Sequence, residues 1–392
     1  NMKVGVIMNG FGKVFSSEAV TKGHPDKVCD QISDAILDEF LRQDAESRVA
    51  CEAMLMPGKV IIAGEISSNG EVDIENTTRM VLKEVGYIKE YHGISYDDCE
   101  VEINIVPQSM DIACGISSDA SNNIQEIGAG DQGIMHGYAT KETSEFMPLP
   151  YVLARKLVQR LDRAREEQEI DYLLSDGKAQ VSVLYDNNMK PCKIVNVVLS
   201  SQTLQDVDIT QIRKDLYKNI ICEVLPSDML DDETGIFINP TGQFVSGGAK
   251  ADCGLTGRKI IVDTYGGWGR HGGGAFSGKD PTKVDRSGAF MARYIAKNLI
   301  TSNVCERADV QIAYAIGRRE PMGVYIDTFG TGKLHEEVIA KNVEDQMDLS
   351  LGAIIQKFDL KKPIYKQLAT YGSFGHKDLN LPWEKIIYYM GR

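Results

Sequence analysis

Two neighbouring stretches, Arg48-Val-Ala-Cys-Glu-Ala-Met-Leu-Met56 and Lys59-Val-Ile-Ile-Ala-Gly-Glu-Ile66, place small or apolar residues at every second position. This period is typical of strands with one buried face, and the short gap between the stretches predicts a hairpin. Similar pairs recur twice along the chain, at 180–185 with 193–199 and at 309–316 with 322–328. Successive pairs lie about 130 residues apart, which indicates an internal repeat of domain size.

Stretches with helical periodicity flank each of these pairs. Residues 26–41 carry apolar side chains at the three- and four-residue spacing of one helix face. Helices are expected before the pairs at 26–41, 151–168 and 285–300, and after them at 72–85, 209–224 and 336–358, the last with a broken periodicity. A strand is expected ahead of each earlier helix, at 14–20, weakly at 136–140, and at 260–265. The order β-α-β-β-α-β therefore occurs three times.

Three such units predict an α/β protein of the α+β type. The chain has 392 residues, and one hydrophobic core rarely serves more than about 250–300. We expect three open sheets, each with helices on one face, packed around a pseudo-threefold axis. The alternative is a chance recurrence of common elements. The domains are placed at 2–120, 121–246 and 247–392, with strands exchanged between domains allowed for.

Composition narrows the classes of protein. Forty-three Lys and Arg face 56 Asp and Glu, a net charge of −13, which disfavours nucleic acid as a partner. No stretch approaches the ~18 consecutive apolar residues of a membrane span, and we expect a cytoplasmic protein with no membrane partner. The eight cysteines form no CxxC pair, so reduced thiols are expected. An acidic chain that binds a polyphosphate needs a local group of cations.

The glycine-rich segment Gly128-Ala-Gly-Asp131-Gln-Gly133 matches G-x-G-x-x-G. A dinucleotide site requires a strand before this motif and a helix after it. The preceding residues 122–127 make a poor strand, and residues 134–139 make a poor helix start. We therefore reject a Rossmann site.

A second glycine-rich segment, residues 263–285, nearly matches the Walker A loop through Gly273, Gly278 and Lys279. Asp280 stands where Ser or Thr should bind magnesium, and Pro281 prevents a helix from continuing after the lysine. A P-loop fold is therefore unsupported. Backbone amides freed by glycine and four nearby cations could still hold phosphate; the alternative is a flexible loop with solvated lysines. These cations are Arg258, Lys259, Lys279 and Lys283.

Asp26 and Asp285 each stand at the start of an expected helix, in the first and third repeats. Helix capping is the simplest role for either residue alone. Lysines lie within two positions of both, however, and the second repeat has Met147-Pro-Leu-Pro-Tyr151 at the same place. We hypothesise that Asp26 and Asp285 each bind one Mg²⁺ on a shared polyphosphate.

Three further side chains have local contexts that suggest contact with a ligand. His24 is held in place by Pro25 and could reach a reacting group. Phe244 and Trp268 lie beside glycines and could stack on a base. Most lone histidines are structural, and most such aromatic residues pack in a core, so these roles remain hypotheses.

Four motifs resemble the signatures of the S-adenosylmethionine synthetase (methionine adenosyltransferase) family, and the likeness runs from about residue 14 to residue 383. The motifs are Gly23-His-Pro-Asp-Lys27, Gly128-Ala-Gly-Asp-Gln-Gly133, Asp252-Cys-Gly-Leu-Thr-Gly-Arg-Lys259 and Gly272-Gly-Gly-Ala-Phe-Ser-Gly-Lys-Asp-Pro-Thr-Lys-Val-Asp-Arg286. The resemblance implies that methionine sulfur attacks the 5′ carbon of ATP and displaces tripolyphosphate, which is then hydrolysed to pyrophosphate and phosphate. It also implies two Mg²⁺ and one K⁺ per site, a homodimer whose active site lies between the subunits, and pairing of dimers into a homotetramer.

The resemblance assigns roles by motif position. Metal binding falls to Asp26 and Asp285 for Mg²⁺ and to Glu52 for K⁺. ATP binding falls to Glu18, His24, Asp176, Lys178, Gln243, Phe244, Asp252, Arg258, Lys259, Ala275 and Lys279. Methionine binding falls to Glu65, Gln108, Asp131, Asp252 and Lys283. The catalytic residues would be His24, Lys178, Arg258 and Lys279.

Three departures from the family pattern stand out. Gln243 replaces an arginine near the nucleotide, and Met110 and Cys114 replace a proline and a glutamine in a gating-loop motif. Residues 249–251 replace a stretch that contains proline. We expect weaker ATP binding or altered loop closure.

Two other functions fit parts of the pattern. A ring-shaped, clamp-like interaction protein would also contain three similar domains, but its cations would be spread along an inner surface. A phosphotransferase could use the loop at Lys279. Formation of S-adenosylmethionine from ATP and methionine would separate both from the leading prediction.

Overall fold

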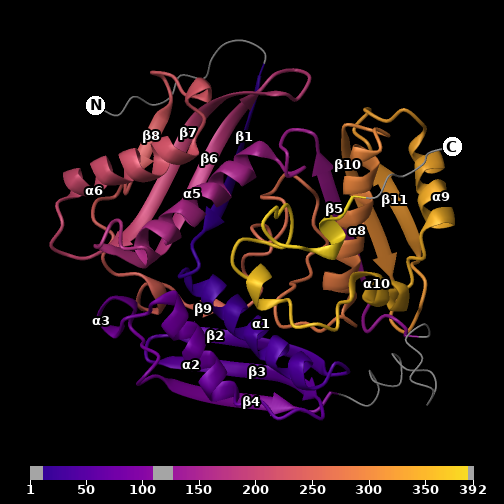
Figure 1. The fold of residues 1–392 in the computed structure, drawn as a ribbon, viewed down its shortest axis with the longest axis horizontal. Helices are drawn as coiled ribbons and strands as arrows, with labels where there is room; N and C mark the ends of the chain where they lie inside the picture. Colours follow the sequence, from indigo (N-terminus) through magenta and orange to yellow (C-terminus); the bar gives the residue numbers. More distant parts are fainter. Residues whose placement is uncertain (1–11, 109–126, 387–392) are drawn as a thin grey trace.

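The computed structural model describes residues 12–108 and 127–386, which form three sheets with helices packed on them (Figure 1). The first third contains β1 (Lys13–Val20), α1 (Pro25–Gln43), β2 (Arg48–Met56), β3 (Lys59–Ser67), α2 (Ile74–Val85), α3 (Lys89–His92) and β4 (Glu100–Val106). The central third contains β5 (Gly133–Thr140), α5 (Leu149–Glu166), β6 (Leu173–Tyr185), β7 (Pro191–Thr203), α6 (Ile209–Leu216), a π-helical turn (Tyr217–Ile221), α7 (Cys222–Val224), a 3₁₀ turn (Ser227–Met229) and β8 (Gly235–Ile238).

The last third repeats the pattern with longer connections. It contains a 3₁₀ turn (Gly248–Lys250), β9 (Gly254–Leu255), α8 (Val284–Thr301), β10 (Arg307–Tyr314), β11 (Gly323–Asp327), α9 (Glu336–Gln346), α10 (Leu351–Phe358) and two 3₁₀ turns (Lys366–Leu368 and Pro382–Glu384). The predicted three-domain α/β fold is confirmed, as are its three hairpins and its three long helices.

Each sheet has one edge strand that comes from a different third of the chain than its other strands. These borrowed strands are β9, β1 and β5. The strand orders are β4-β3-β2-β9, β1-β6-β7-β8 and β11-β10-β5. In all three sheets the borrowed strand lies antiparallel to the first strand of the hairpin, as β1 does beside β6 in Figure 1. The exchange is cyclic, so the three units hold one another together through main-chain hydrogen bonds.

The prediction of a strand at 260–265 is wrong. These residues form helical turns, in which the N–H of Asp263 donates to the carbonyl of Lys259 at 2.9 Å. The third borrowed strand is instead β9, which has only two residues. A side chain at Gly254 would lie 2.3 Å from the carbonyl oxygen of Pro25, so β9 runs against the start of α1 where only glycine fits.

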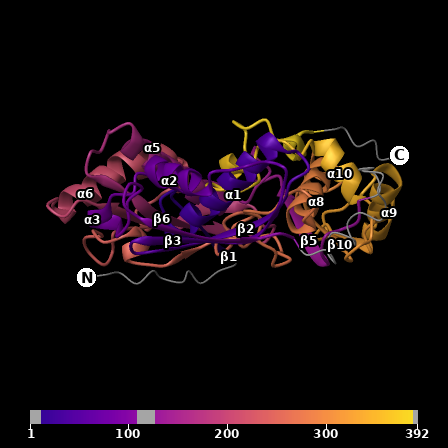
Figure 2. The same ribbon diagram turned by 90° about the horizontal axis from the view of Figure 1, so that it is seen from below.

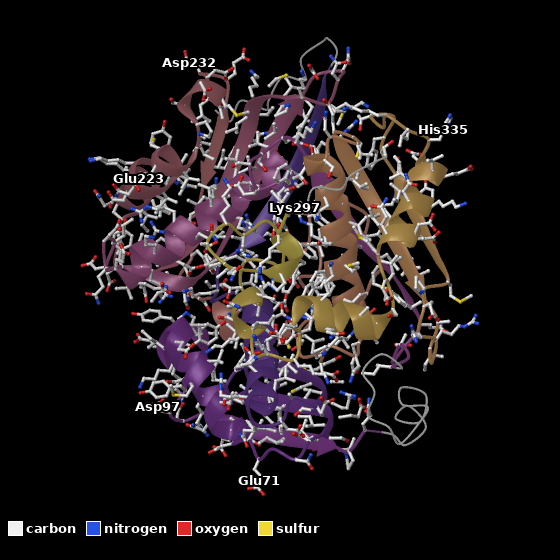
Figure 3. The ribbon with its side chains drawn as sticks, turned by 45° about the vertical axis from the view of Figure 1, so that its right-hand side comes forward. Glu71, Asp97, Glu223, Asp232, Lys297 and His335 are labelled. Atoms are coloured by element: carbon white, nitrogen blue, oxygen red, sulfur yellow. The ribbon has the colours of Figure 1, made fainter. Side chains whose placement is uncertain are left out.

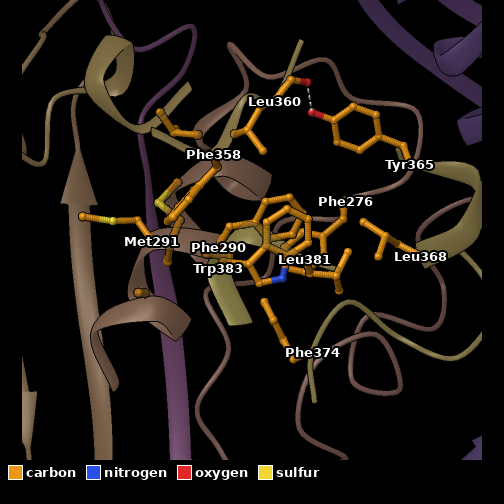
Figure 4. Packing of buried hydrophobic residues seen from close by; sticks show 14 of the residues in the cluster. Phe276, Phe290, Met291, Phe358, Leu360, Tyr365, Leu368, Phe374, Leu381 and Trp383 are labelled. Atoms are coloured by element: carbon orange, nitrogen blue, oxygen red, sulfur yellow. Dashed lines mark hydrogen bonds between the residues drawn. The ribbon is translucent and has the colours of Figure 1, made fainter. Parts of the chain in front are cut away.

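All three sheets lie toward one side of a flattened molecule, and α1, α5 and α8 cover their other side (Figure 2). Almost every residue of α8 is buried. Its Phe290 stacks on Trp383 with ring centroids 3.8 Å apart (Figure 4). Lys297 of the same helix, labelled in Figure 3, is buried and donates to Glu384 at 2.7 Å. No helix in the described residues is long and apolar enough to span a membrane.

α1 carries four buried aspartates, Asp26, Asp30, Asp34 and Asp38, one every fourth residue. This spacing puts them on one face of the helix. Their carboxylates accept backbone N–H groups from the last third of the chain, namely those of Leu255 (3.0 Å), Gly257 (2.9 Å), Gly278 (2.8 Å), Tyr365 (3.0 Å) and Lys366 (2.9 Å). This aspartate ladder attaches the first third of the molecule to the last.

Candidate active site

The two acids predicted from the repeat occupy the same position in their helices. Asp26 is the second residue of α1 and Asp285 is the second residue of α8. The residues that cap these helices are His24 and Lys283, so capping does not account for either aspartate. Both carboxylates are directed at groups outside their own helices.

Asp26 is fully buried and surrounded by donors. Nζ of Lys259 lies 2.6 Å from Oδ2, and Nη1 of Arg258 lies 3.7 Å from Oδ1, which also accepts the N–H of Leu255. Burial alone would raise the pKa of Asp26, but the hydrogen bonds from Lys259 and Leu255 outweigh it and lower this pKa. The carboxylate is therefore a fixed negative charge beside two cations.

His24 lies next to this carboxylate. Its Nδ1 accepts the N–H of Asp26 at 3.2 Å, so the proton of the neutral ring is on Nε2. Burial, and then the charge of Lys259, lowers the pKa of His24 to about 3. Ligand atoms of His24, Asp26 and Asp252 lie within 4.8 Å of one another. The ring can thus donate one hydrogen bond while it remains uncharged.

The paired strands β1 and β6 bring three more predicted residues, Glu18, Asp176 and Lys178, to the same place. Lys178 on β6 pairs in register with Val20, and its Nζ lies 2.6 Å from Glu18 on β1. Asp176 accepts the N–H of Gly248 at 2.8 Å. Burial, together with the charges of nearby aspartates, raises the pKa of Asp176 to about 6. Strand exchange therefore assembles this side of the site.

The glycine-rich loop before α8 builds the second acidic group. Lys279 lies 2.6 Å from Oδ2 of Asp285. The loop runs along β2, where the N–H of Cys51 donates to Gly278 at 3.0 Å. Gly278 has φ of +77°, and a side chain there would lie 1.8 Å from the carbonyl oxygen of Cys51, so glycine is required.

Asp280 has a structural role in this loop. It is fully buried and accepts the N–H of Val49 at 2.7 Å, that of Thr282 at 2.9 Å, and Nζ of Lys283. These bonds attach the loop to β2 and exclude a Walker A arrangement. The four cations expected to form one cradle are divided among three carboxylates, since Lys283 pairs with Asp280.

Two contacts connect the Asp26 group (His24, Asp26, Arg258 and Lys259) with the Asp285 group (Lys279 and Asp285). A side chain at Gly257 would lie 2.6 Å from Cβ of Ala275, so the turn before Arg258 packs against the glycine-rich loop. Asp34 receives both terminal nitrogens of the buried Arg286 at 2.7 Å. Sequence reasoning missed Asp34 and Arg286, although the four-residue spacing of acids in α1 was a visible signal.

The remaining predicted residues make no side-chain hydrogen bond or ion pair with Asp26 or Asp285 in the described part of the chain. Two of them nevertheless border the glycine-rich loop: Ala50, opposite Glu65 in the hairpin, bridges to Lys279, and the N–H of Gly130, next to Asp131, donates to Thr282 at 3.4 Å. Glu52 and Glu65 are exposed on the sheet face that α1 leaves open, and Asp131 is exposed. The N–H of Gln108 donates to Ser67, the exposed Gln243 donates to the carbonyl of Val207 at 2.7 Å, and Phe244 is half-buried. Met110 and Cys114 lie outside the described residues.

Trp268 is half-buried and packs against the core. Its ring lies 4.3 Å from that of Phe15 and 4.8 Å from that of Tyr185, measured between centroids. Stacking on a base is therefore unsupported for Trp268.

The helix start of the central repeat has no acid in the equivalent position. α5 begins at Leu149, so its second residue is Pro150. Its N-terminus is instead met by Glu142, which accepts the N–H of Leu149 at 3.2 Å and the hydroxyl of Tyr185 at 2.7 Å. Burial raises the pKa of Glu142 even though these bonds oppose it.

Comparison with known proteins gives matches over nearly the whole chain. Three sequence models match in order: S-adenosylmethionine synthetase, N-terminal domain (residues 12–110), central domain (126–244) and C-terminal domain (246–385). A protein named S-adenosylmethionine synthase from Clostridium botulinum (strain Alaska E43 / Type E3) is 51% identical over 380 residues, which cover 95% of this chain and 97% of the relative.

Proposed function

The chain belongs to the S-adenosylmethionine synthetase family and is a methionine adenosyltransferase, and we propose that its reaction takes place between the Asp26 and Asp285 groups. The observation that carries this proposal is the shared geometry of the two acids, each at the second residue of a repeat-equivalent helix and each beside lysine. Methionine sulfur attacks the 5′ carbon of ATP, and the bond from that carbon to the tripolyphosphate breaks.

The chain's own groups fit the demands of this step. A thioether sulfur is a good neutral nucleophile, so no side chain has to act as a base. The negative charge that develops on the leaving oxygen requires preorganised donors and cations. We assign Nε2–H of His24 as one donor, and Lys178, Arg258, Lys259 and Lys279 as cations along the tripolyphosphate. Glu18, Asp176, Gln243, Phe244, Asp252 and Ala275 complete the proposed ATP contacts.

The donor atoms also fit two Mg²⁺ ions. Asp26 and Asp285 offer carboxylate oxygens, the ligands that Mg²⁺ prefers. Each oxygen of Asp26 accepts one hydrogen bond, from Leu255 or from Lys259, and so keeps a further lone pair. Bound Mg²⁺ supplies positive charge to the phosphate oxygens. We propose Asp26 and Asp285 as its protein ligands and Glu52 as the ligand of K⁺.

We propose that the methionine contacts require a second subunit. Glu65 and Glu52 lie on the open face of their sheet, and all three sheets lie toward the same side of the molecule (Figure 2). A homodimer formed through that side would enclose these residues together with Gln108, Asp131, Asp252 and Lys283. Pairing of dimers into a tetramer, the domain limits 2–120, 121–246 and 247–392, and a cytoplasmic location also remain proposals.

A product analysis tests the assignment. The protein is incubated with ATP, methionine, Mg²⁺ and K⁺, and the products are separated chromatographically. We expect S-adenosylmethionine, pyrophosphate and phosphate, with loss of all three when Mg²⁺ is chelated. Transfer of a phosphate from ATP without adenosyl transfer would contradict the proposal and favour a phosphotransferase. Mass photometry over a range of concentrations would test the dimer and the tetramer.

A further inference from the structure

Tyr87 and His92 form a buried pair beside the loop that carries His24. Tyr87 follows α2 and His92 ends α3, and their rings stack with centroids 4.4 Å apart and planes 5° apart. Both side chains are almost inaccessible to solvent. The hydroxyl of Tyr87 donates to the carbonyl of Gly23 at 2.8 Å. The pair therefore touches the residue immediately before His24.

His92 connects the pair to the central sheet. Nδ1 of His92 lies 2.9 Å from the backbone nitrogen of Ile88 and 3.1 Å from its carbonyl oxygen, and Nε2 lies 3.0 Å from Oγ of Ser175. Burial lowers the pKa of His92 to about 4 and raises that of Tyr87 well above its usual value. Both rings thus keep the hydrogens that these contacts need at ordinary pH.

Two glycines show how closely this pair is enclosed. A side chain at Gly248 would lie 2.9 Å from the ring of His92, and the N–H of Gly248 is held by Asp176. A side chain at Gly23 would lie 2.3 Å from the carbonyl oxygen of Ser175. Gly23 is therefore fixed between Ser175 on one side and the hydroxyl of Tyr87 on another.

We propose that Tyr87 is a positioning residue for His24, held in its own position by His92. The proposal rests on the role of His24 assigned above. Fixing the Gly23 carbonyl fixes the peptide that leads into His24, and therefore the direction in which Nε2–H points. Displacements of about 1 Å in a reacting group can lower a rate by about 10²-fold. All three thirds of the chain contribute to the orientation of His24, through Tyr87, Ser175 and Gly248.

The test removes a single oxygen atom. In Tyr87→Phe the ring stack stays and the bond to Gly23 is lost. We expect kcat to fall about tenfold while KM for ATP and for methionine stays within about twofold, because orientation rather than binding is impaired. Tyr314→Phe is the matched control, since that buried hydroxyl also donates to a backbone carbonyl, of Leu349 at 2.7 Å. Tyr314→Phe should leave kcat unchanged.

A double-mutant cycle with His24→Asn separates this proposal from the proposed function. Asn retains an acceptor for helix capping but has no group equivalent to Nε2–H. If Tyr87 acts through His24, the tenfold effect of Tyr87→Phe should disappear in the His24→Asn background. The same tenfold loss in both backgrounds, or an equal loss in Tyr314→Phe, would overturn the positioning role while the role of His24 stands. An unchanged kcat in His24→Asn alone would overturn the role of His24, and this inference with it.

Discussion

The starts of α1 and α5 are equivalent places in two repeats, but the carboxylates that lie there have partners of different kinds. Asp26 faces Lys259 and Arg258, whereas Glu142 at α5 accepts hydrogen bonds from an N–H and two neutral hydroxyls. Burial acts to raise the pKa of both. The hydrogen bonds from Lys259 and Leu255 outweigh burial for Asp26, whereas the partners of Glu142 do not outweigh it.

The proposed role of Asp26 in the reaction depends on this difference in the charge of its partners. A carboxylate held by neutral donors has nothing to exchange with a charged ligand. A carboxylate paired with cations can share them with phosphate and can itself hold a metal ion. α8 follows α1 in this respect, through Asp285 and Lys279. Two of the three helix starts therefore carry a carboxylate paired with a lysine, as the proposed site requires, and the third carries one held by neutral donors.

The largest effect should follow from Asp26→Asn. The amide cannot balance Lys259 and Arg258 or serve as a negatively charged metal ligand. We expect kcat to fall by about 10²- to 10³-fold, the cost of losing a preorganised electrostatic group. Steady-state kinetics at saturating ATP, methionine and Mg²⁺ measure it. A fall of less than threefold would remove the distinction between α1 and α5.

Asp34→Asn should act on stability. The variant leaves Arg286 buried without its counter-charge, although the amide can still accept the N–H of Gly278. Breaking a buried ion pair of this kind costs about 3 kcal/mol or more. Urea denaturation followed by circular dichroism gives the change in unfolding free energy. Glu39→Gln, which removes an exposed pairing with Arg42 on the same helix, is the control and should change it little.

Gln243→Arg asks whether the central repeat can also contribute charge to the nucleotide. Gln243 is exposed and follows β8. A new charge-assisted contact is worth about 1 kcal/mol, so KM for ATP should fall about threefold to tenfold. Gln243→Lys provides a cation without the guanidinium fork and should give a smaller change. An unchanged KM in both variants would mean that this position does not contact ATP.

The smallest effect is expected for Glu142→Gln, the counterpart of Asp26→Asn. The amide oxygen can still accept from Leu149 and Tyr185, so kcat should stay within about twofold. Because the folded protein raises the pKa of Glu142, its ionised form opposes folding, and the contribution of Glu142 to stability falls as pH rises above the ordinary value of 4.5. The variant should therefore gain stability relative to wild type as pH increases. Thermal melts at pH 4 and pH 8 measure this, and the reverse trend would contradict the assignment.

Local patterns in the sequence were enough to predict much of the fold. Alternation at 48–66 predicted the first hairpin, and helical spacing predicted α1, α5 and α8 to within a few residues. The repeat also led to Asp26 and Asp285 as a pair. These features depend on near neighbours in the chain, and burial of one face is visible in the order of residues.

Long-range contacts left no such signal. β9 has two residues and therefore no alternation. The apolar residues at 260–262 suggested a strand, but they form helical turns in which the carbonyl of Val262 accepts the hydroxyl of Tyr151 at 2.7 Å. At the start of α5 the carboxylate comes from Glu142 in the preceding turn, and this arrangement also depends on tertiary packing. Bonds between side chains and backbone over more than 200 residues cannot be inferred from spacing alone.

The aspartate ladder of α1 has a consequence for how the chain folds during synthesis. Four carboxylates one turn apart repel one another in an isolated helix, and the N–H groups that neutralise this repulsion begin at Leu255. A nascent chain shorter than about 255 residues contains α1 without these donors. The N-terminal part of the protein is made first, yet its central helix depends on backbone donors that lie more than 200 residues further along the chain. Folding should therefore finish after translation, and not domain by domain.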